Sequence, residues 1–313
     1  MTNQDAEADT PPPSPKQLVD GLVRLLTVQP EGDHRFTGRP QEDGFGRMFG
    51  GQVIAQALQA AQKTVTDGKQ AHSMHAYFLR GGEEGPVTDL QVEADFDGRS
   101  FANRRVVASQ QAKDGSQRPI LNLTASFQRP EEGVSHDDYI MPVVSPPEDL
   151  RPDMDLRREF ADKAGITGSV RDIMLRARPI EMRTTDKLHW MNSEPRAPAA
   201  HSWFRAATSL PPLEGNEGLH RAIIAYASDY TLLGTSALPH GLSWMRGELV
   251  GASLDHAIWF HRPAPADEWL LYATDSPWSG NGRGFNRGRI FTRDGQLVAS
   301  VAQEGMMRRR KGS

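Results

Sequence analysis

The chain repeats one pattern twice, and this internal repeat limits the folds that its 313 residues can adopt. Each half begins with an apolar helical pattern, at residues 51–61 in the first half and 219–229 in the second. A His-Ala strand, a Gly-Arg turn, an Asp-Gly hairpin signal and a last strand ending in glutamine follow in the same order. The matched segments are 75–80 with 256–261, 98–101 with 282–285, 114–115 with 294–295, and Gln128 with Gln303. We therefore predict an α+β fold in which one helix-plus-antiparallel-sheet unit is used twice.

Periodicity within the first half supports this unit. A helix is expected from Pro15, with Ser14 as its N-cap, and a polar loop should follow it. The pattern at 51–61 places its aliphatic residues on one face and its glutamines on the other. Between residues 90 and 96, apolar and polar residues alternate, which is typical of a half-buried antiparallel strand. The glycines before residue 51 lack the strand and the third glycine of a dinucleotide-binding turn, because Phe49 stands there.

The chain divides into four expected segments. Residues 1–14 are acidic and then proline-rich, and they indicate a disordered tail. Residues 15–130 form the N-terminal repeat and residues 180–313 the C-terminal repeat. The intervening stretch, 131–179, is rich in proline and charge and is interpreted as a linker with one short helix near 155–164.

Composition excludes several classes of function. The chain has no cysteine, so disulfides, thiolate metal sites and a thiol nucleophile are excluded, and we expect a cytoplasmic location. A formal net charge of −4 gives no general reason to bind nucleic acid or an anionic membrane. No apolar run is long enough for a membrane span, and no secretory signal is evident.

The second repeated helix ends in a carboxylate. Residues 221–228 are largely alanine and long aliphatic residues, and Asp229 follows them directly. A carboxylate beside so much apolar sequence is costly unless a polar group receives it. An aspartate at a helix end can also bond the next turn or face water, so this stretch alone leaves a structural role open.

Several separate motifs resemble the acyl-CoA thioesterase II family. They are Phe-Gly-Gly-Gln at 49–52, the run at 72–79, Tyr-Ala-Ser-Asp at 226–229, Pro-His-Gly at 239–241, the run at 255–262, and Val-Ala-Gln-Glu-Gly at 301–305. The resemblance covers about residues 35–308 and implies a double hotdog fold, in which each half wraps an antiparallel sheet around a long helix. It also implies hydrolysis of acyl-CoA to free fatty acid and CoA, without a covalent intermediate or a cofactor.

The resemblance also assigns candidate site residues. The family uses an Asp, a Thr and a Gln to hold and activate water, and its motifs place the Asp on Asp229 and the Gln on Gln303. The Thr position holds Ser253, which keeps the hydroxyl but loses the methyl group that restricts the rotamer. We expect Gly50 and Gly51 to let the substrate approach a helix N-terminus, although the helix start at 217–219 could serve instead.

Other mechanisms receive less support. No Gly-x-Ser-x-Gly motif of a serine hydrolase occurs, and the pair at 72 and 75 lacks the partner of a zinc helix, so we expect no metal. Asp255 and His256 are strand neighbours that point to opposite faces, which makes them a poor catalytic pair. Arginines should bind the CoA phosphates, and the candidates are Arg104, Arg105, Arg287, Arg289 and the run at 308–310.

The sequence therefore predicts an acyl-CoA thioesterase that forms a homo-oligomer and binds neither nucleic acid nor membrane. The oligomer is implied by the resemblance, because the exposed sheets of such units usually pack together. Two alternatives stay open: a hotdog protein that binds acyl-CoA or lipid without turnover, and a hotdog enoyl-CoA hydratase. A hydratase calls for an Asp/His pair close in sequence, whereas His240 lies well beyond Asp229.

Overall fold

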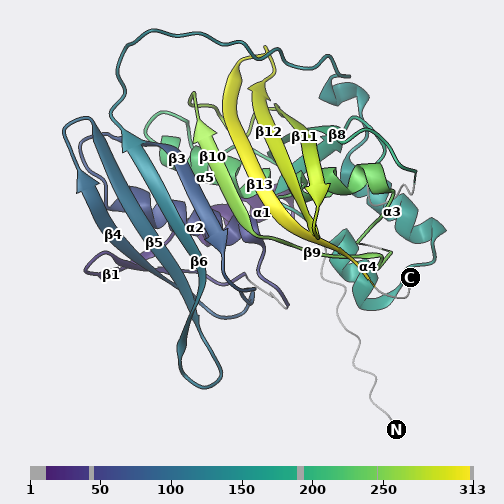
Figure 1. The fold of residues 1–313 in the computed structure, drawn as a ribbon, viewed down its shortest axis with the longest axis horizontal. Coiled ribbons are helices and arrows are strands. Elements are labelled where there is room, and N and C mark those ends of the chain that lie inside the picture. The colour runs from purple at the N-terminus through teal and green to yellow at the C-terminus, as the bar shows by residue number, and fades with distance from the viewer. Residues whose placement is uncertain (1–11, 42–45, 189–193, 245, 311–313) are drawn as a thin grey trace.

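The computed structural model describes residues 12–41, 46–188, 194–244 and 246–310. Most of the tail expected at 1–14 lies outside the described residues. The described chain forms two similar halves, each with a long helix packed against antiparallel strands (Figure 1). In this view the strands lie in front of α1, α2 and α5, so one face of the sheet carries these helices.

The first half begins with the two helices that the sequence predicts. In α1 (Pro15–Leu26), Ser14 and Gln17 form a capping box in which each side chain bonds the backbone of the other residue. Helix α2 (Gly50–Lys63) buries most of its residues, including Gln56, whose Nε2 donates to the Leu25 carbonyl at 2.8 Å. This bond fastens the end of α1 to the middle of α2.

The strands of the first half form an antiparallel sheet in which β3 (Gln70–Phe78) pairs with β6 (Gln117–Gln128) and not with β4 (Thr88–Asp97), so their order is not a simple meander. A short hairpin stands where the sequence analysis expected a polar loop. Asp33 and His34 turn this hairpin with positive φ of 43° and 56°, a conformation that short polar residues tolerate better than most. The residues of this hairpin are held in an extended conformation because β2 pairs with β4. The strands are β1 (Gln29–Gly32), β2 (Arg35–Gly38), β3 (Gln70–Phe78), β4 (Thr88–Asp97), β5 (Phe101–Gln111) and β6 (Gln117–Gln128).

The second half repeats the unit around α5 (Glu217–Ser228), which is followed by the 3-10 segment η3 (Leu232–His240). Its strands are β7 (Ile180–Thr184), β8 (Ala199–Ala206), β9 (Leu249–Ser253), β10 (Asp255–Phe260), β11 (Leu270–Gly280), β12 (Arg283–Thr292) and β13 (Leu297–Arg309). The strand order is β1-β2-β4-β5-β6-β3-β10-β13-β12-β11-β8-β7, with β9 paired to β13. The antiparallel pairing of β3 with β10 therefore joins the two halves into one sheet.

Helices α2 and α5 pack against each other in opposite directions. Near the start of α2, Gly51 lies against the Tyr226 carbonyl at the end of α5. Near the other end, Gln59 Nε2 donates to the carbonyl of Gly218 at 3.1 Å. The N-terminus of α2 therefore meets the C-terminus of α5, where Asp229 follows.

One detail of the predicted repeat alignment is wrong. The sequence match aligned His75 with His256, but β3 pairs with β10 so that His75 lies opposite Ala257 and His256 opposite Ala76. His75 is exposed whereas His256 is fully buried. Equivalent residues of two repeats should point to the same face of the sheet, and side chains alternate between faces along a strand. His75 and His256 point to opposite faces, so the match is displaced by one residue.

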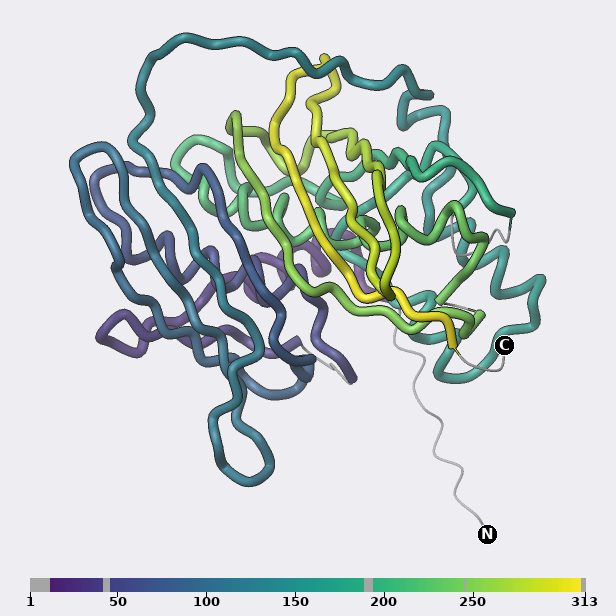
Figure 2. The backbone as a smooth tube through the Cα atoms, in the orientation of Figure 1, coloured from purple at the N-terminus to yellow at the C-terminus, as the bar shows by residue number. Residues whose placement is uncertain are grey.

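The segment between the repeats contains more helix than the one that was predicted. Helix α3 (Asp153–Lys163) begins two residues before the predicted start, and α4 (Gly168–Leu175) occupies part of the basic stretch. In Figure 2 the chain after β6 crosses to the C-terminal half before it reaches α3. Both helices thus lie beside the C-terminal half, although the assignment of 131–179 as a linker stays a prediction.

Candidate active site

Asp229 stands where α5 ends, and its side chain is only 6% exposed. The apolar residues of α5 bury the helix against the sheet, so the carboxylate that follows is carried inward with it. Its Oδ1 accepts a hydrogen bond from Gln303 Nε2 at 2.7 Å. The structure therefore brings together two of the residues that the sequence analysis named, although they are 74 positions apart.

Burial raises the pKa of Asp229 from 3.8 to about 6, because a charged carboxylate is poorly solvated inside the protein. Hydrogen bonds from Gln303, the Gly51 backbone and the Ser253 hydroxyl each act to lower the pKa. These three groups come from β13, the start of α2 and β9. The carboxylate is therefore still mostly ionised at neutral pH, but it binds a proton far more readily than an exposed aspartate.

His256 fixes the orientation of Gln303, and the sequence analysis missed this role. The His256 ring is fully buried, with Nδ1 3.1 Å from Gln303 Nε2 and Nε2 2.9 Å from the Ser228 hydroxyl. Burial lowers the pKa of His256 to about 3, so the ring is neutral. Ser228 Oγ also donates to the Ala225 carbonyl at 2.9 Å, so it accepts from His256 Nε2–H and leaves Nδ1 as an acceptor.

Gln303 must then donate through Nε2 to both His256 and Asp229. With its amide held this way, Gln303 Oε1 has no hydrogen-bond partner among the described residues, although it is buried. A buried acceptor of this kind is costly and normally finds a donor. The amide that bonds Asp229 therefore carries an acceptor that no described residue uses.

The structure separates Asp255 from His256, as their neighbouring positions on a strand require. Asp255 Oδ1 accepts from the Glu304 backbone N–H at 2.6 Å, on the other side of β10. Ser228, which precedes Asp229, is the residue that could have pointed to His256. Its hydroxyl is buried when α5 packs on the sheet, and a buried hydroxyl needs a hydrogen-bond partner. Sequence spacing could not reveal it, because Ser228 and His256 are 28 residues apart.

Ser253 reaches the site through the pairing of β9 with β13. In this pair Ser253 lies opposite Gly305, two positions beyond Gln303. Its hydroxyl bonds the Asp229 carboxylate and lowers the pKa of that group. All three residues that the resemblance implied therefore converge.

Gly50 and Gly51 form the wall of the site at the N-terminus of α2. A Cβ atom on Gly50 would lie 2.6 Å from Asp229 Oδ2, and one on Gly51 would lie 2.4 Å from the Tyr226 carbonyl oxygen. The first turn of a helix also leaves backbone N–H groups without intrahelical partners. This decides the question that the sequence left open: the start of α2, and not that of α5, adjoins Asp229.

A cavity of about 290 Å³ opens onto these groups. Gly50, Asp229 and Ser253 lie in its wall, together with apolar residues that include Val53, Phe78 and Ile120. At its rim are Arg47 and Arg80, two arginines that the sequence analysis did not name as candidates. The cavity combines apolar residues, a buried carboxylate and nearby positive charge.

The structure does not bring Arg104 or Arg287 to this cavity. Arg104 is buried and donates to Asp97 at 2.7 Å and to the hydroxyl and carbonyl of Thr64. Thr64 follows the last turn of α2, about 20 Å from Gly50 at 1.5 Å per helical residue. Arg287 is paired with Asp275 through two bonds of 2.9 and 2.7 Å. Both guanidinium groups are engaged in structural contacts.

None of the described helices has the length and hydropathy that crossing a membrane would need. Within the residues that the structure describes, no group of three or more histidine, aspartate or glutamate side chains is arranged to hold a metal ion.

Two family models match this chain, one in each half. Models of the acyl-CoA thioesterase N-terminal and C-terminal domains match residues 39–128 and 147–307. Human acyl-coenzyme A thioesterase 8 is 35% identical over 92% of this chain and 88% of its own. The crystal structure of an acyl-CoA thioesterase II from Mycobacterium marinum superimposes with a TM-score of 0.72 at 36% identity, covering 93% of this chain and 99% of the other.

The fold is also found in a more distant protein. A conserved protein with a hot dog fold from Alicyclobacillus acidocaldarius matches with a TM-score of 0.70 at 16% identity, over 92% of this chain and 97% of its own. This likeness concerns the fold alone, and with the two repeated halves it confirms the predicted α+β double hotdog. The two domain models together span most of the sequence, and the chain belongs to the acyl-CoA thioesterase family.

Proposed function

We propose that this protein hydrolyses acyl-CoA to a free fatty acid and CoA, with Asp229 as the general base. The observation that carries the proposal is a buried carboxylate with a pKa of about 6, bonded to Gln303 at 2.7 Å and open to a partly apolar cavity. A base of this pKa is ionised at neutral pH and still accepts a proton well. The names of the relatives support acyl-CoA as the substrate class.

The reaction needs one water molecule and no covalent intermediate. Gln303 Oε1 and the Ser253 hydroxyl would hold the water while Asp229 removes its proton. The water oxygen then attacks the thioester carbonyl carbon, and the tetrahedral intermediate collapses with cleavage of the carbon–sulfur bond. The thiolate of CoA takes up a proton as it leaves. Asp229 is the group placed to return it.

The N-terminus of α2 would stabilise the oxyanion of that intermediate. Gly50 lies in the cavity wall, and without a side chain there a substrate carbonyl can come close to the backbone. Free N–H groups at a helix start point outward and favour negative charge. The same helix end holds the Asp229 carboxylate, so base and oxyanion share one electrostatic environment.

The decisive experiment measures thiol release from acyl-CoAs of increasing chain length, with wild type beside Asp229→Asn. We expect the variant to lose about 10²- to 10⁴-fold in kcat, the range for removal of a general base. Asp275→Asn is the matched control, because Asp275 pairs with arginines away from the cavity. Circular dichroism should show that both variants fold.

The outcomes separate the alternatives. Tight binding of acyl-CoA without thiol release from any substrate would leave a binding protein. Loss of enoyl absorbance without thiol release would indicate a hydratase. Full activity of Asp229→Asn would keep the thioesterase and show that another group acts as the base.

We further propose that Arg47 and Arg80, rather than Arg104 and Arg287, meet the CoA phosphates. Arg80 lines both the Asp229 cavity and a neighbouring hollow that also contains Lys113. Arg80 Nη1 donates to the Pro119 carbonyl at 2.9 Å, and this neutral acceptor leaves the charge of Arg80 uncompensated. Arg80 therefore remains available to a phosphate.

Steady-state kinetics of Arg80→Gln tests this binding role. We expect KM for acyl-CoA to rise about ten-fold with kcat nearly unchanged, because the contact is made equally in ground state and transition state. Arg287→Gln is the control and should leave KM within about two-fold of wild type. A larger effect of Arg287→Gln than of Arg80→Gln would restore the original assignment.

A homo-oligomer and a cytoplasmic location also remain proposals. The oligomer is supported by aromatic side chains on the face of the sheet opposite the helices, among them Tyr77 at 63% and Trp259 at 37% exposed. The location is supported by a chain without cysteine, which suits a reducing compartment.

A further inference from the structure

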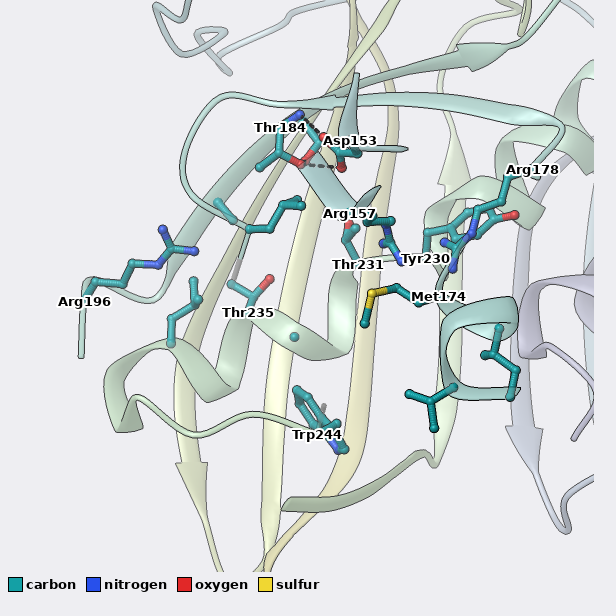
Figure 3. A pocket seen from close by; sticks show the side chains of 17 residues that line it. Asp153, Arg157, Met174, Arg178, Thr184, Arg196, Tyr230, Thr231, Thr235 and Trp244 are labelled. Carbon is teal, nitrogen blue, oxygen red and sulfur yellow. Dashed lines mark hydrogen bonds between the residues drawn. The ribbon is translucent and has the colours of Figure 1, made fainter. Parts of the chain in front are cut away.

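A second cavity, of about 360 Å³, lies between α3, α4 and η3 in the C-terminal half (Figure 3). Helix α3 contributes Asp153 and Arg157, and η3 contributes Thr235 and Leu238. None of its described lining residues lines the Asp229 cavity. Two of its lining residues, Tyr230 and Thr231, follow Asp229 directly in the chain.

Two arginines face each other in this cavity. Arg157 and Arg178 come from separate segments, and Figure 3 shows both side chains reaching toward Tyr230. Arg178 lies over the Tyr230 ring at 5.2 Å. Burial, and then the charge of Arg178, lower the pKa of Arg157 to about 10, so the two guanidinium groups repel each other in a poorly solvated place.

The one carboxylate among the described lining residues, that of Asp153, acts to raise the pKa of Arg157 and so offsets part of the positive charge. Asp153 accepts hydrogen bonds from the backbone N–H and the hydroxyl of Thr184, both at 2.8 Å. A third arginine, Arg196, also lines the cavity. The lining therefore carries three guanidinium groups and one carboxylate, which leaves positive charge to attract an anion.

Most of the rest of the wall is apolar, although four serine and threonine hydroxyls also line it, those of Thr184, Ser202, Thr231 and Thr235. Val170 and Ile173 of α4 are 54% and 56% exposed, although both are aliphatic, while Met174 beside them is buried. Trp244 lines the opposite side, as Figure 3 shows. Exposed aliphatic side chains beside a cavity are typical of a place where an apolar ligand enters.

We propose that this cavity is a second ligand site, which binds a fatty acid by its carboxylate head group and alkyl chain. Arg157 and Arg178 would bind the carboxylate, since a guanidinium matches both of its oxygens. The α4 residues and Trp244 would contact the alkyl chain. The apolar walls suit a chain of methylene groups better than a nucleotide. The site goes beyond the proposed reaction, because it needs no turnover and does not include Asp229.

The binding of dodecanoate to the full chain tests this site, with Trp244 as the reporter. A dodecanoate that carries bromine on its terminal carbon should quench tryptophan fluorescence, and Trp244→Phe should remove most of that quenching. Arg178→Met, which keeps the length of the side chain, should weaken binding of dodecanoate about ten-fold or more, because it removes a charged hydrogen-bond donor. Calorimetry measures the affinity directly.

A matched control is Arg171→Met. Arg171 lies on α4, is paired with Asp162 at 2.7 Å and does not line the cavity. It should leave the affinity unchanged. Dodecanol, which has the chain without the carboxylate, should bind at least ten-fold more weakly than dodecanoate to the wild type. A non-hydrolysable thioether analogue of dodecanoyl-CoA at saturation should leave one dodecanoate bound.

Three results would overturn the proposal. One is equal affinity of dodecanoate for wild type and Arg178→Met, and another is equal affinity of the wild type for dodecanoate and dodecanol. The third is complete displacement of dodecanoate by the thioether analogue, which would place the fatty acid in the Asp229 cavity. All of these are binding readouts, so they are distinct from a failure of Asp229→Asn to abolish hydrolysis.

Discussion

At Asp229, the requirements of a stable core oppose those of the proposed general base. Burial makes the charged form unfavourable and raises the pKa to about 6. A group whose pKa is higher in the folded state stabilises the fold only while it is protonated. That contribution is fully present below the ordinary value of 3.8 and is lost as the pH rises through about 6.

Activity and stability should therefore change in opposite directions with pH. We expect kcat/KM to rise through a pH of about 6 and to level off above 7, because only the ionised carboxylate accepts the proton from water. A pH–rate profile measures this. A profile that falls between pH 5 and 7 would contradict Asp229 as the base.

Replacement of Asp229 by asparagine should stabilise the folded protein at high pH. The difference between about 6 and 3.8 corresponds to about 3 kcal/mol at 1.36 kcal/mol per pH unit, so Asp229→Asn should gain up to that free energy of unfolding at pH 8. Near pH 4 the gain should vanish, since the wild-type carboxyl is then protonated in the fold. Urea denaturation at both pH values provides the comparison.

At the scale of elements, the antiparallel packing of α2 on α5 creates the site. It places the start of α2 beside Asp229 and the start of α5 beside Gln59. The two helix starts thus have unlike surroundings, even though each half of the repeat contains one such helix. A side chain should be tolerated at one start and harmful at the other.

Alanine substitutions of glycine test this asymmetry. In Gly50→Ala the new Cβ would lie 2.6 Å from Asp229 Oδ2, so the carboxylate must move and kcat should fall about a hundred-fold. In Gly218→Ala the nearest atom is Gln62 Cγ at 3.3 Å, on a flexible side chain, and kcat should stay within about two-fold. Equal losses in both variants would show that the effect comes from the helix and not from the site.

At the scale of the whole molecule, β3 and β10 join the halves and leave aromatic residues on the outer face. Tyr77 and His75 of β3 are exposed there, and the His75 ring meets Trp259 of β10 edge-on at 5.0 Å. A patch of this kind at the centre of a sheet is typical of a surface that another subunit covers.

The double variant Tyr77→Glu/Trp259→Glu should therefore shift the protein to the monomer. Burial of a charge without a partner is costly, so an interface through this patch should not form. Light scattering after size exclusion gives the mass of each species. Val134→Lys is the control, because Val134 is fully exposed in the segment after β6. An unchanged mass in the double variant would place the interface elsewhere.

Local patterns in the sequence determined the elements and the repeated fold. The periodic apolar residues of α2 and α5 and the alternating residues of β4 predict these elements. Such a periodicity can be recognised within a short stretch of the chain, without knowledge of the tertiary structure. The hairpin of β1 and β2 was missed, since its strands are polar and persist only through pairing with β4. Asp229, Ser253 and Gln303 came from motifs, and their convergence could not be computed from spacing.

Tertiary structure alone decided the partners of these residues. The bond from His256 to Gln303, the proximity of Gly50 to Asp229 and the remoteness of Arg104 all depend on which elements pack together and in which register. A displacement of one residue moves a strand side chain to the other face, as His75 and His256 illustrate. The sequence thus determined the fold and the kind of chemistry, because these follow from local pattern and residue type. The geometry of the site required the packed structure, because contacts between distant residues exist only there.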